Sequence, residues 1–215
     1  MNEAIPLGTV EEGNQIRSER RDAAENRARI LATAEQLFAE RGVETVNMAD
    51  IAQAAGVGKG TLYRNFANKA ELCLALMDAH LAEFQNETLE QMRQMTMNGV
   101  PRLQQLGQFL DRLVYFTDTH LPLLCEVQRE GLLQEHAAAE LQRPHFWLHM
   151  TVSGLLQAAD AGGELEPGVD ISYTADALLA PLNSSIFRFQ REVRGFSPAR
   201  ISAGLRRLVA GLRKH

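Results

Sequence analysis

A short stretch of the chain, GVGKGTLYRNFANK, combines side chains that suit DNA with the absence of any acidic residue. It holds three cations, Lys59, Arg64 and Lys69. Arginine suits the hydrogen-bonding edge of guanine, and the methyl group of Thr61 suits the methyl group of thymine. Lys59 and Tyr63 suit backbone phosphates. This combination predicts binding in the major groove of a DNA duplex.

Residues 47–66 have the pattern of a helix-turn-helix, which would position these side chains. A short first helix has Ala52 on its inner face, Gly56 supplies the positive φ of a sharp turn, and Leu62 anchors the second helix. An alternative for the segment is a helical hairpin with an ordinary solvated basic face. Separately, Tyr63 could pack against the first helix of the chain. In the first interpretation the second helix exposes Lys59, Thr61, Tyr63, Arg64 and Asn65.

The composition of the chain favours helices over strands. Its 215 residues include 29 leucines and 28 alanines against 18 valines and isoleucines, and unbranched side chains lose less freedom in a helix. No apolar run reaches the roughly 18 residues that a membrane span needs. Cys73 and Cys125 lie far apart in apolar stretches, as expected of reduced thiols. We therefore expect an all-α, cytoplasmic protein that makes no membrane contact.

Apolar periodicity, prolines and glycines predict three regions. Residues 1–16 are expected to be a flexible tail, residues 17–68 a helix-turn-helix DNA-binding domain, and residues 69–215 a larger helical bundle for ligand binding and dimerisation. A long helix opens the bundle and ends near Met95. Beyond Pro101, amphipathic segments are predicted at 101–118, 122–135, 138–161, 171–193 and 198–213.

Charge is unevenly distributed along the chain. The formal net charge is -5, yet residues 15–70 hold nine Lys or Arg against seven acids, whereas residues 71–215 hold thirteen against seventeen. Repulsion would keep an acidic bundle away from the duplex. The distribution therefore favours docking through the basic amino-terminal region.

The segment from Asn26 to Leu72, above all GVGKGTLYRNFANKAEL, resembles the amino-terminal domain of the tetracycline-repressor (TetR) family. The resemblance implies a homodimeric transcription regulator, usually a repressor, whose carboxy-terminal helices bind a small molecule and dimerise. This family commonly has serine at the place of Gly58 and histidine at that of Asn65. The chain therefore lacks one hydroxyl cap, and the phosphate role of Asn65 stays open.

The resemblance also implies roles for single residues. Lys69 would meet a phosphate with the help of the helix dipole at the start of its helix. Asn47 would do so from the first helix of the motif. Further DNA contacts are implied for Lys59, Thr61, Tyr63 and Arg64.

These features predict a repressor that binds a palindromic operator as a dimer, with its recognition helices about 34 to 36 Å apart in successive major grooves. A small molecule in the bundle would tilt the helix that follows Lys69, and the dimer would release DNA through the different affinities of two states. The alternative is an architectural or division-linked protein that binds DNA with the same head and has no effector.

Aromatic residues with a few polar neighbours mark a candidate ligand pocket in the bundle. Arg129 or His120 could orient an anion or a hydroxyl group there. Each apolar stripe taken alone also fits plain core packing. The candidate ligand-binding residues are Phe109, Phe116, His120, Arg129, Trp147, Met150, Asn183 and Phe187.

The last two predicted helices carry continuous apolar stripes. Paired with their symmetry mates as a four-helix interface, they would remove a large apolar patch from water. Packing within one subunit is the alternative. The candidate interface residues are Leu178, Leu182, Ile186, Phe189, Ile201, Leu205, Leu208 and Leu212.

Two patterns suggest an enzyme or a metal site, and both are incomplete. GVGKGT is not a phosphate-binding loop, because Gln53 and Gly60 stand where such a loop has its first glycine and its final hydroxyl residue. His145 and His149 lie four residues apart, yet two ligands do not make a metal site. We therefore expect no catalysis, no cofactor and no metal.

Overall fold

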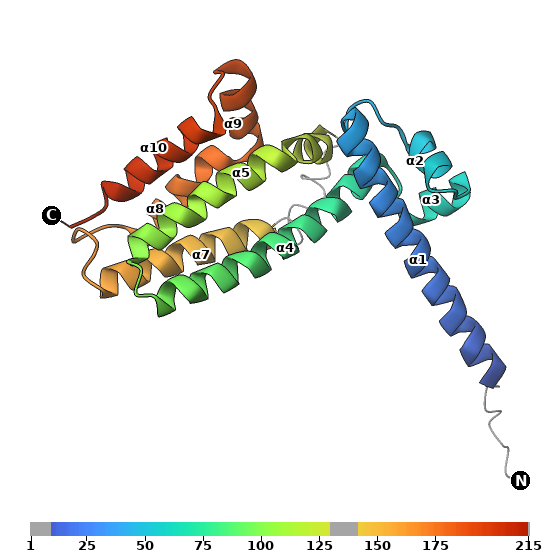
Figure 1. Cartoon of the computed structure of the whole chain (residues 1–215), viewed down its shortest axis with the longest axis horizontal. Helices are drawn as coiled ribbons and strands as arrows, with labels where there is room; N and C mark the ends of the chain where they lie inside the picture. Colours follow the sequence, from blue (N-terminus) through green and yellow to red (C-terminus); the bar gives the residue numbers. More distant parts are fainter. Residues whose placement is uncertain (1–9, 130–141, 215) are drawn as a thin grey trace, which may run out of the picture. The chain divides into compact units, whose positions relative to one another are not determined.

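The computed structural model describes residues 10–129 and 142–214, and these fold into helices (Figure 1). The predicted all-α fold is confirmed. The chain divides into two compact units, Met1–Leu72 and Cys73–His215, so the division falls inside a helix rather than at the predicted boundary before Lys69. None of the described helices is both long and apolar enough to cross a lipid bilayer.

The first unit is built around a small apolar core. Ile30, Ala34, Ile51 and Leu62 are all completely buried. Gly56 has φ +64° and forms the sharp turn before the third helix, a conformation that costs glycine little. The elements of this unit are α1 (Val10–Arg41), α2 (Met48–Ala54), α3 (Lys59–Asn65) and the first turn of α4 (Lys69–Met97).

The first helix begins earlier than the sequence predicted. α1 starts at Val10, so residues 10–16 are helical and do not belong to a tail; residues 1–9 lie outside the described part. Adding a residue to an existing helix costs far less than starting one. No proline interrupts α1. The helix is anchored by the buried Ile30 and therefore extends toward the amino terminus even though its first turns carry no apolar stripe.

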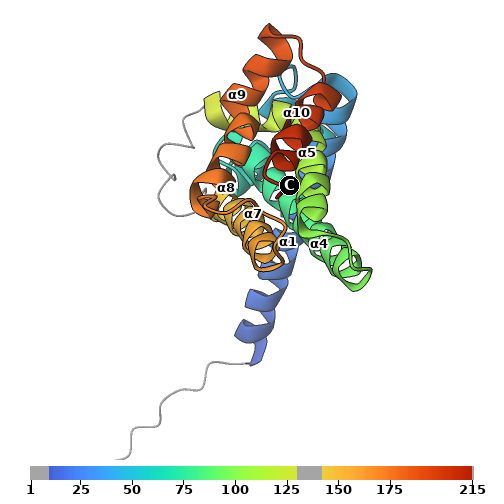
Figure 2. The ribbon, with the colours of Figure 1, turned by 90° about the vertical axis from the view of Figure 1, so that its left-hand side faces the viewer.

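The second unit is organised around α5, which packs against α7, α9 and α10 (Figures 1 and 2). Leu106, Leu110 and Val114 of α5 are completely buried, as are Leu156 and Phe187 from other helices. Besides the remainder of α4, the unit contains α5 (Arg102–Arg129), α7 (Gln142–Ala161), α8 (Ile171–Leu179), a 3-10 turn (Ala180–Leu182), α9 (Ser184–Arg188), a π-helical turn (Phe189–Val193) and α10 (Pro198–Ala210).

The predicted break near Pro122 does not occur. Segments 101–118 and 122–135 were expected to be separate, but α5 runs through Pro122 to Arg129, and residues 130–135 lie outside the described part. Leu121, Leu123 and Val127 are buried on both sides of the proline. Burial of one continuous stripe outweighs the cost of a proline inside a helix, about 3 kcal/mol.

The predicted helix over 171–193 is interrupted. α8 ends at Leu179, and a 3-10 turn containing Pro181 follows. Asn183 then starts a new helix, because its side-chain oxygen accepts a hydrogen bond from the Ser185 amide at 3.1 Å. The apolar stripe from 175 to 193 is therefore not one face of one helix.

A carboxylate distant in sequence caps α5. Glu164, in the turn after α7, accepts hydrogen bonds from the backbone amides of Arg102 at 2.7 Å and Leu103 at 3.0 Å. Amides in the first turn of a helix have no partner within that helix, and the positive end of the helix dipole favours an anion. Glu164 therefore joins the end of one bundle helix to the start of another.

We predict that Glu164→Ala lowers the free energy of unfolding by about 1 to 2 kcal/mol, the usual cost of losing a helix cap. Glu164→Gln should lower it less, because an acceptor oxygen remains. Urea denaturation measures both. Glu83→Ala, which removes an exposed carboxylate, is the control, and an equal loss in that variant would contradict a capping role for Glu164.

Candidate nucleic-acid interface

Packing of α3 determines which of its side chains face outward. Leu62 and the following Phe66 are buried, with exposed fractions of 0% and 2%. On the other side of the helix Lys59 and Arg64 are exposed, and Tyr63 is 52% exposed. Tyr63 is therefore not sequestered against α1. Thr61 is half-buried beside this exposed face.

Two of the polar residues on α3 bond to their own helix. The Asn65 side-chain amide donates to the Thr61 carbonyl at 2.8 Å, and Arg64 Nε donates to the Gly60 carbonyl at 3.3 Å. The sequence predicts that Asn65 points outward. In the structure its side-chain amide instead turns back along the helix. Arg64 keeps its two terminal guanidinium nitrogens for other partners.

An arginine on α1 holds the carboxyl end of α3, and sequence reasoning missed it. Arg27 donates to the Asn65 carbonyl at 3.1 Å. Its guanidinium carbon also lies 4.3 Å from the centre of the Phe66 ring, within cation–π range. An arginine three residues before Ile30 offers no motif that would have revealed this contact, because the Asn65 carbonyl lies 38 residues away.

Capping boxes set both ends of the motif. Asn47 accepts from the amides of Ala49 and Asp50 at 2.9 and 3.0 Å, and Asp50 accepts from the Asn47 amide at 3.0 Å. This reciprocal pair starts α2, as the sequence predicted. The Asn47 oxygen is therefore occupied, and its side-chain NH2 is the group that remains for a phosphate.

The start of α4 has a similar arrangement. Asn68 accepts from the Glu71 amide at 2.8 Å, and Glu71 accepts from the Ala67 amide at 2.7 Å. Lys69 is thereby held, half-buried, in the first turn of a 29-residue helix. The acids of this region, Asp50 and Glu71, are both bound to backbone amides, which offsets their repulsion of an approaching anion.

In the second unit, six rings from three helices form an aromatic cluster. Phe84 of α4 lies 4.6 Å from Phe116, 6.3 Å from Phe109 and 6.2 Å from Trp147, between ring centres. His80 and His120 stack at 4.4 Å, and His120 lies 4.5 Å from Phe116. Four predicted ligand-binding residues therefore meet here: Phe109, Phe116, His120 and Trp147.

The other four predicted ligand-binding residues lie elsewhere. Arg129 is exposed and pairs with the buried Glu126 at 2.7 Å, and Met150 is 53% exposed. Asn183 is occupied as the cap of α9. Phe187 is completely buried in the hydrophobic core of the unit. The apolar stripes of the sequence suggested one shared pocket for these residues. The break at Pro181 and the packing of the bundle instead direct them to different places.

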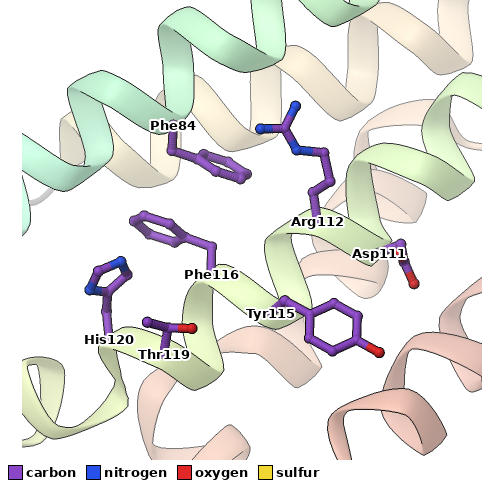
Figure 3. Close-up of a pocket in the computed structure, with 7 residues that line it drawn as sticks. All are labelled: Phe84, Asp111, Arg112, Tyr115, Phe116, Thr119 and His120. Atoms are coloured by element: carbon purple, nitrogen blue, oxygen red, sulfur yellow. The ribbon is translucent and has the colours of Figure 1, made fainter.

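A pocket of about 340 Å³ borders this cluster (Figure 3). The rings of Phe84 and Phe116 face each other at one side, with His120 and Thr119 one turn further along α5. Arg112 points toward α4, while Asp111 and Tyr115 point away from it. Burial, and secondarily the charge of His80, lowers the pKa of His120 to about 4. His120 is therefore a neutral imidazole at neutral pH.

The predicted dimer residues fall into two groups. Ile186, Phe189 and Leu208 are 46%, 51% and 58% exposed. The remaining five pack wholly or partly against the core of their own unit: Leu178, Leu182, Ile201, Leu205 and Leu212. These five residues therefore pack within their own subunit, which is the alternative that the sequence left open.

The histidines considered as metal ligands give no site. His149 Nδ1 lies 2.7 Å from the carboxylate of Asp176, which ties α7 to α8. The side chain of His145 lies outside the described part. Among the side chains that are described, no three His, Cys, Asp or Glu residues gather in a way that could hold a metal ion.

Comparison with known proteins places this arrangement among bacterial regulators. Residues 30–76 match the family described as bacterial regulatory proteins, tetR family. An HTH-type transcriptional regulator of Staphylococcus aureus strain MRSA252 is 31% identical over 179 residues, which cover 83% of this chain and 89% of the relative. A regulator of strain USA300 is 32% identical over 182 residues, with the same coverage.

Solved structures share the fold. A transcriptional regulator from Saccharomonospora viridis, in complex with choline, has a TM-score of 0.67 and 18% identity, with coverage of 89% of this chain and 100% of that one. Thermus thermophilus FadR, a TetR-family repressor in complex with lauroyl-CoA, has a TM-score of 0.63 and 22% identity, with coverage of 86% and 93%.

Proposed function

Because the chain belongs to the tetR family of bacterial regulatory proteins, we propose that it is a cytoplasmic repressor that binds a palindromic operator as a homodimer. Members of this family are DNA-binding transcription regulators and not, in general, enzymes. The observation that carries the proposal is the exposed face of α3, where Lys59, Tyr63 and Arg64 stand opposite the buried Leu62.

The side chains of this face divide into base-reading and phosphate-binding groups. Arg64 is assigned to a guanine edge through its terminal nitrogens, and the Thr61 methyl group to thymine. Lys59 and Tyr63 bind phosphates. From the two capped helix starts, the Asn47 amide and Lys69 bind further phosphates. Asn65, which bonds to its own helix, has a supporting role only.

Dimerisation is proposed through the carboxy-terminal elements of the second unit. Ile186, Phe189 and Leu208 expose large apolar side chains, which a second subunit would remove from water. A closed two-fold dimer would then present two copies of α3 to one operator. The other five residues of the predicted interface pack against the core of their own unit and hold the carboxy-terminal elements in place.

Release is proposed to follow binding of a small molecule beside Phe84 and Phe116. Phe84 belongs to α4, the helix that also carries Lys69 in its first turn. A ligand that favours one position of α4 over another shifts the balance between DNA-binding and DNA-free states by its difference in affinity for them.

Selection of bound duplexes from a random pool by the purified protein tests the proposal. We expect enriched sequences with two-fold symmetry and half-sites separated by about one helical turn. Equal retention of every duplex, or enrichment of a single unrepeated site, would refute the palindromic operator. A protein that selects such sites but binds no small molecule would fit the architectural alternative.

We predict different effects for a base-reading and a phosphate-binding residue. Arg64→Ala should weaken discrimination among selected sequences, by about 1 to 3 kcal/mol at the affected base pair. Lys69→Ala should weaken binding to all sequences alike and reduce the salt dependence of log affinity by about one per subunit. Fluorescence anisotropy over a salt series measures both, and an unchanged sequence ranking in Arg64→Ala excludes base reading.

We predict a third pattern for Arg27, because its contacts with Asn65 and Phe66 lie within the protein. Arg27→Met removes a charged hydrogen bond and a cation–π contact, and affinity should fall about tenfold with no change in salt dependence. Arg27→Lys should recover part of the loss. Arg29→Met is the matched control, because in the described part of the chain the Arg29 side chain hydrogen-bonds to Asn26, three residues earlier on the same helix. A lower salt slope in Arg27→Met would instead indicate a phosphate contact.

We predict that Phe189→Asp shifts the protein from dimer to monomer in analytical ultracentrifugation, because a buried unpaired carboxylate at an interface is costly. Leu89→Asp is the control: Leu89 is similarly exposed, at 57%, but lies on α4. A Phe189→Asp protein that remains dimeric at micromolar concentration would place the interface elsewhere.

A further inference from the structure

The pocket beside Phe84 and Phe116 carries two formal charges, and both are already neutralised. Asp111 accepts hydrogen bonds from the Ser202 hydroxyl and from Arg206, the latter at 3.0 Å. Arg112 donates to Glu87 at 2.6 Å and to Gln91, and its guanidinium lies 5.5 Å from the Phe84 ring centre. Because each charge already has a counter-charge, a charged ligand would have to compete with these contacts for it.

The remaining polar groups of the lining are neutral. His120 is uncharged at neutral pH, because half-burial and the neighbouring His80 disfavour its protonated form. A neutral imidazole offers one donor and one acceptor. Thr119 adds a hydroxyl group one residue before it (Figure 3). These groups can bind a hydroxyl, amide or carbonyl group, but they supply no counter-charge.

The apolar part of the lining favours a flat ring. Phe84 and Phe116 have ring centres 4.6 Å apart with planes inclined by 33°, and His120 continues from Phe116 at 4.5 Å. Aromatic rings attract each other in offset or tilted arrangements at such separations. A further ring placed in the pocket would extend this series. The pocket is largely open to solvent, and its volume of about 340 Å³ lies near the lower end for small-molecule sites, which favours a compact ligand.

We propose that this pocket binds a neutral, planar aromatic compound of one or two fused rings that carries a hydroxyl, amide or carbonyl group. The inference rests on the proposed regulation by a small molecule and names the chemical class of the effector. Of the sequence-based alternatives, an anion or a hydroxyl group oriented by Arg129 or His120, it keeps the hydroxyl group and His120. Arg129, the other candidate, lies outside this lining and pairs with Glu126.

Isothermal titration calorimetry with three probes of matched shape tests the class. The probes are naphthalene-2-carboxamide, which is neutral, 2-naphthoate, which is anionic, and 2-naphthylmethylammonium, which is cationic. We expect the carboxamide to bind at least tenfold more tightly than either charged probe. Binding of a charged probe as tight as that of the carboxamide, or no binding of the carboxamide, overturns the proposal.

Variants locate the binding to this pocket. Phe116→Ala should weaken carboxamide binding at least tenfold, and Thr119→Val, a change at an exposed position that leaves the core intact, should weaken it severalfold. The control is Gln108→Ala, on the same helix but lining a separate groove beside α10, which should bind as the wild type does. If both single variants, Thr119→Val and Phe116→Ala, bind the carboxamide with wild-type affinity, the assignment of the site is overturned.

The same protein samples separate failure of this inference from failure of the proposed function. Duplex selection without any probe reports on DNA binding alone. Sequence-selective binding with no carboxamide binding overturns the ligand class and leaves the regulator intact. Carboxamide binding without sequence-selective DNA binding supports the pocket and overturns the repressor.

Discussion

Burial of Leu62 and Phe66 is the constraint on which the DNA-binding face depends. These two side chains lie four residues apart and enter the core of the first unit together, so α3 cannot rotate about its axis without exposing one of them. Lys59, Tyr63 and Arg64 are consequently held outward. Arg27 reinforces this orientation, because it binds both the Phe66 ring and the Asn65 carbonyl. A seven-residue helix has little stability of its own, and these tertiary contacts hold it in place.

The second unit combines a buried centre with an aromatic cluster beside which we propose that an effector binds. α5 is buried along much of its length and is capped from a distance by Glu164. Its other face, with Phe116 and His120, meets Phe84 of α4 in the aromatic cluster. Since α4 also carries Lys69 in its first turn, the ring contacts and the residue that we propose binds a phosphate lie on one helix. The proposed release of DNA on ligand binding rests on this shared helix.

Two prolines show how burial decides the fate of a helix. Pro122 lies inside α5, where Leu121, Leu123 and Val127 are buried around it, and the helix continues. At Pro181 the helix stops, and Asn183 caps a new one. The residue type is the same in both places. What differs is the surroundings: buried apolar residues flank Pro122, whereas a polar capping residue, Asn183, follows two residues after Pro181.

The sequence by itself determined the all-α class, the helix-turn-helix and its caps, because these depend on residues within four positions of one another. Asn47 with Asp50, Asn68 with Glu71, and the left-handed Gly56 all act as their spacing predicted. Only the tertiary structure decided which apolar residues face the core and which face solvent: Phe189 and Leu208 are exposed, whereas Leu178 and Leu205 are buried. It also decided that Arg27 supports α3 and that the charges of Asp111 and Arg112 are neutralised. Each of these depends on partners dozens of residues away, and neither periodicity nor motif spacing carries information about them.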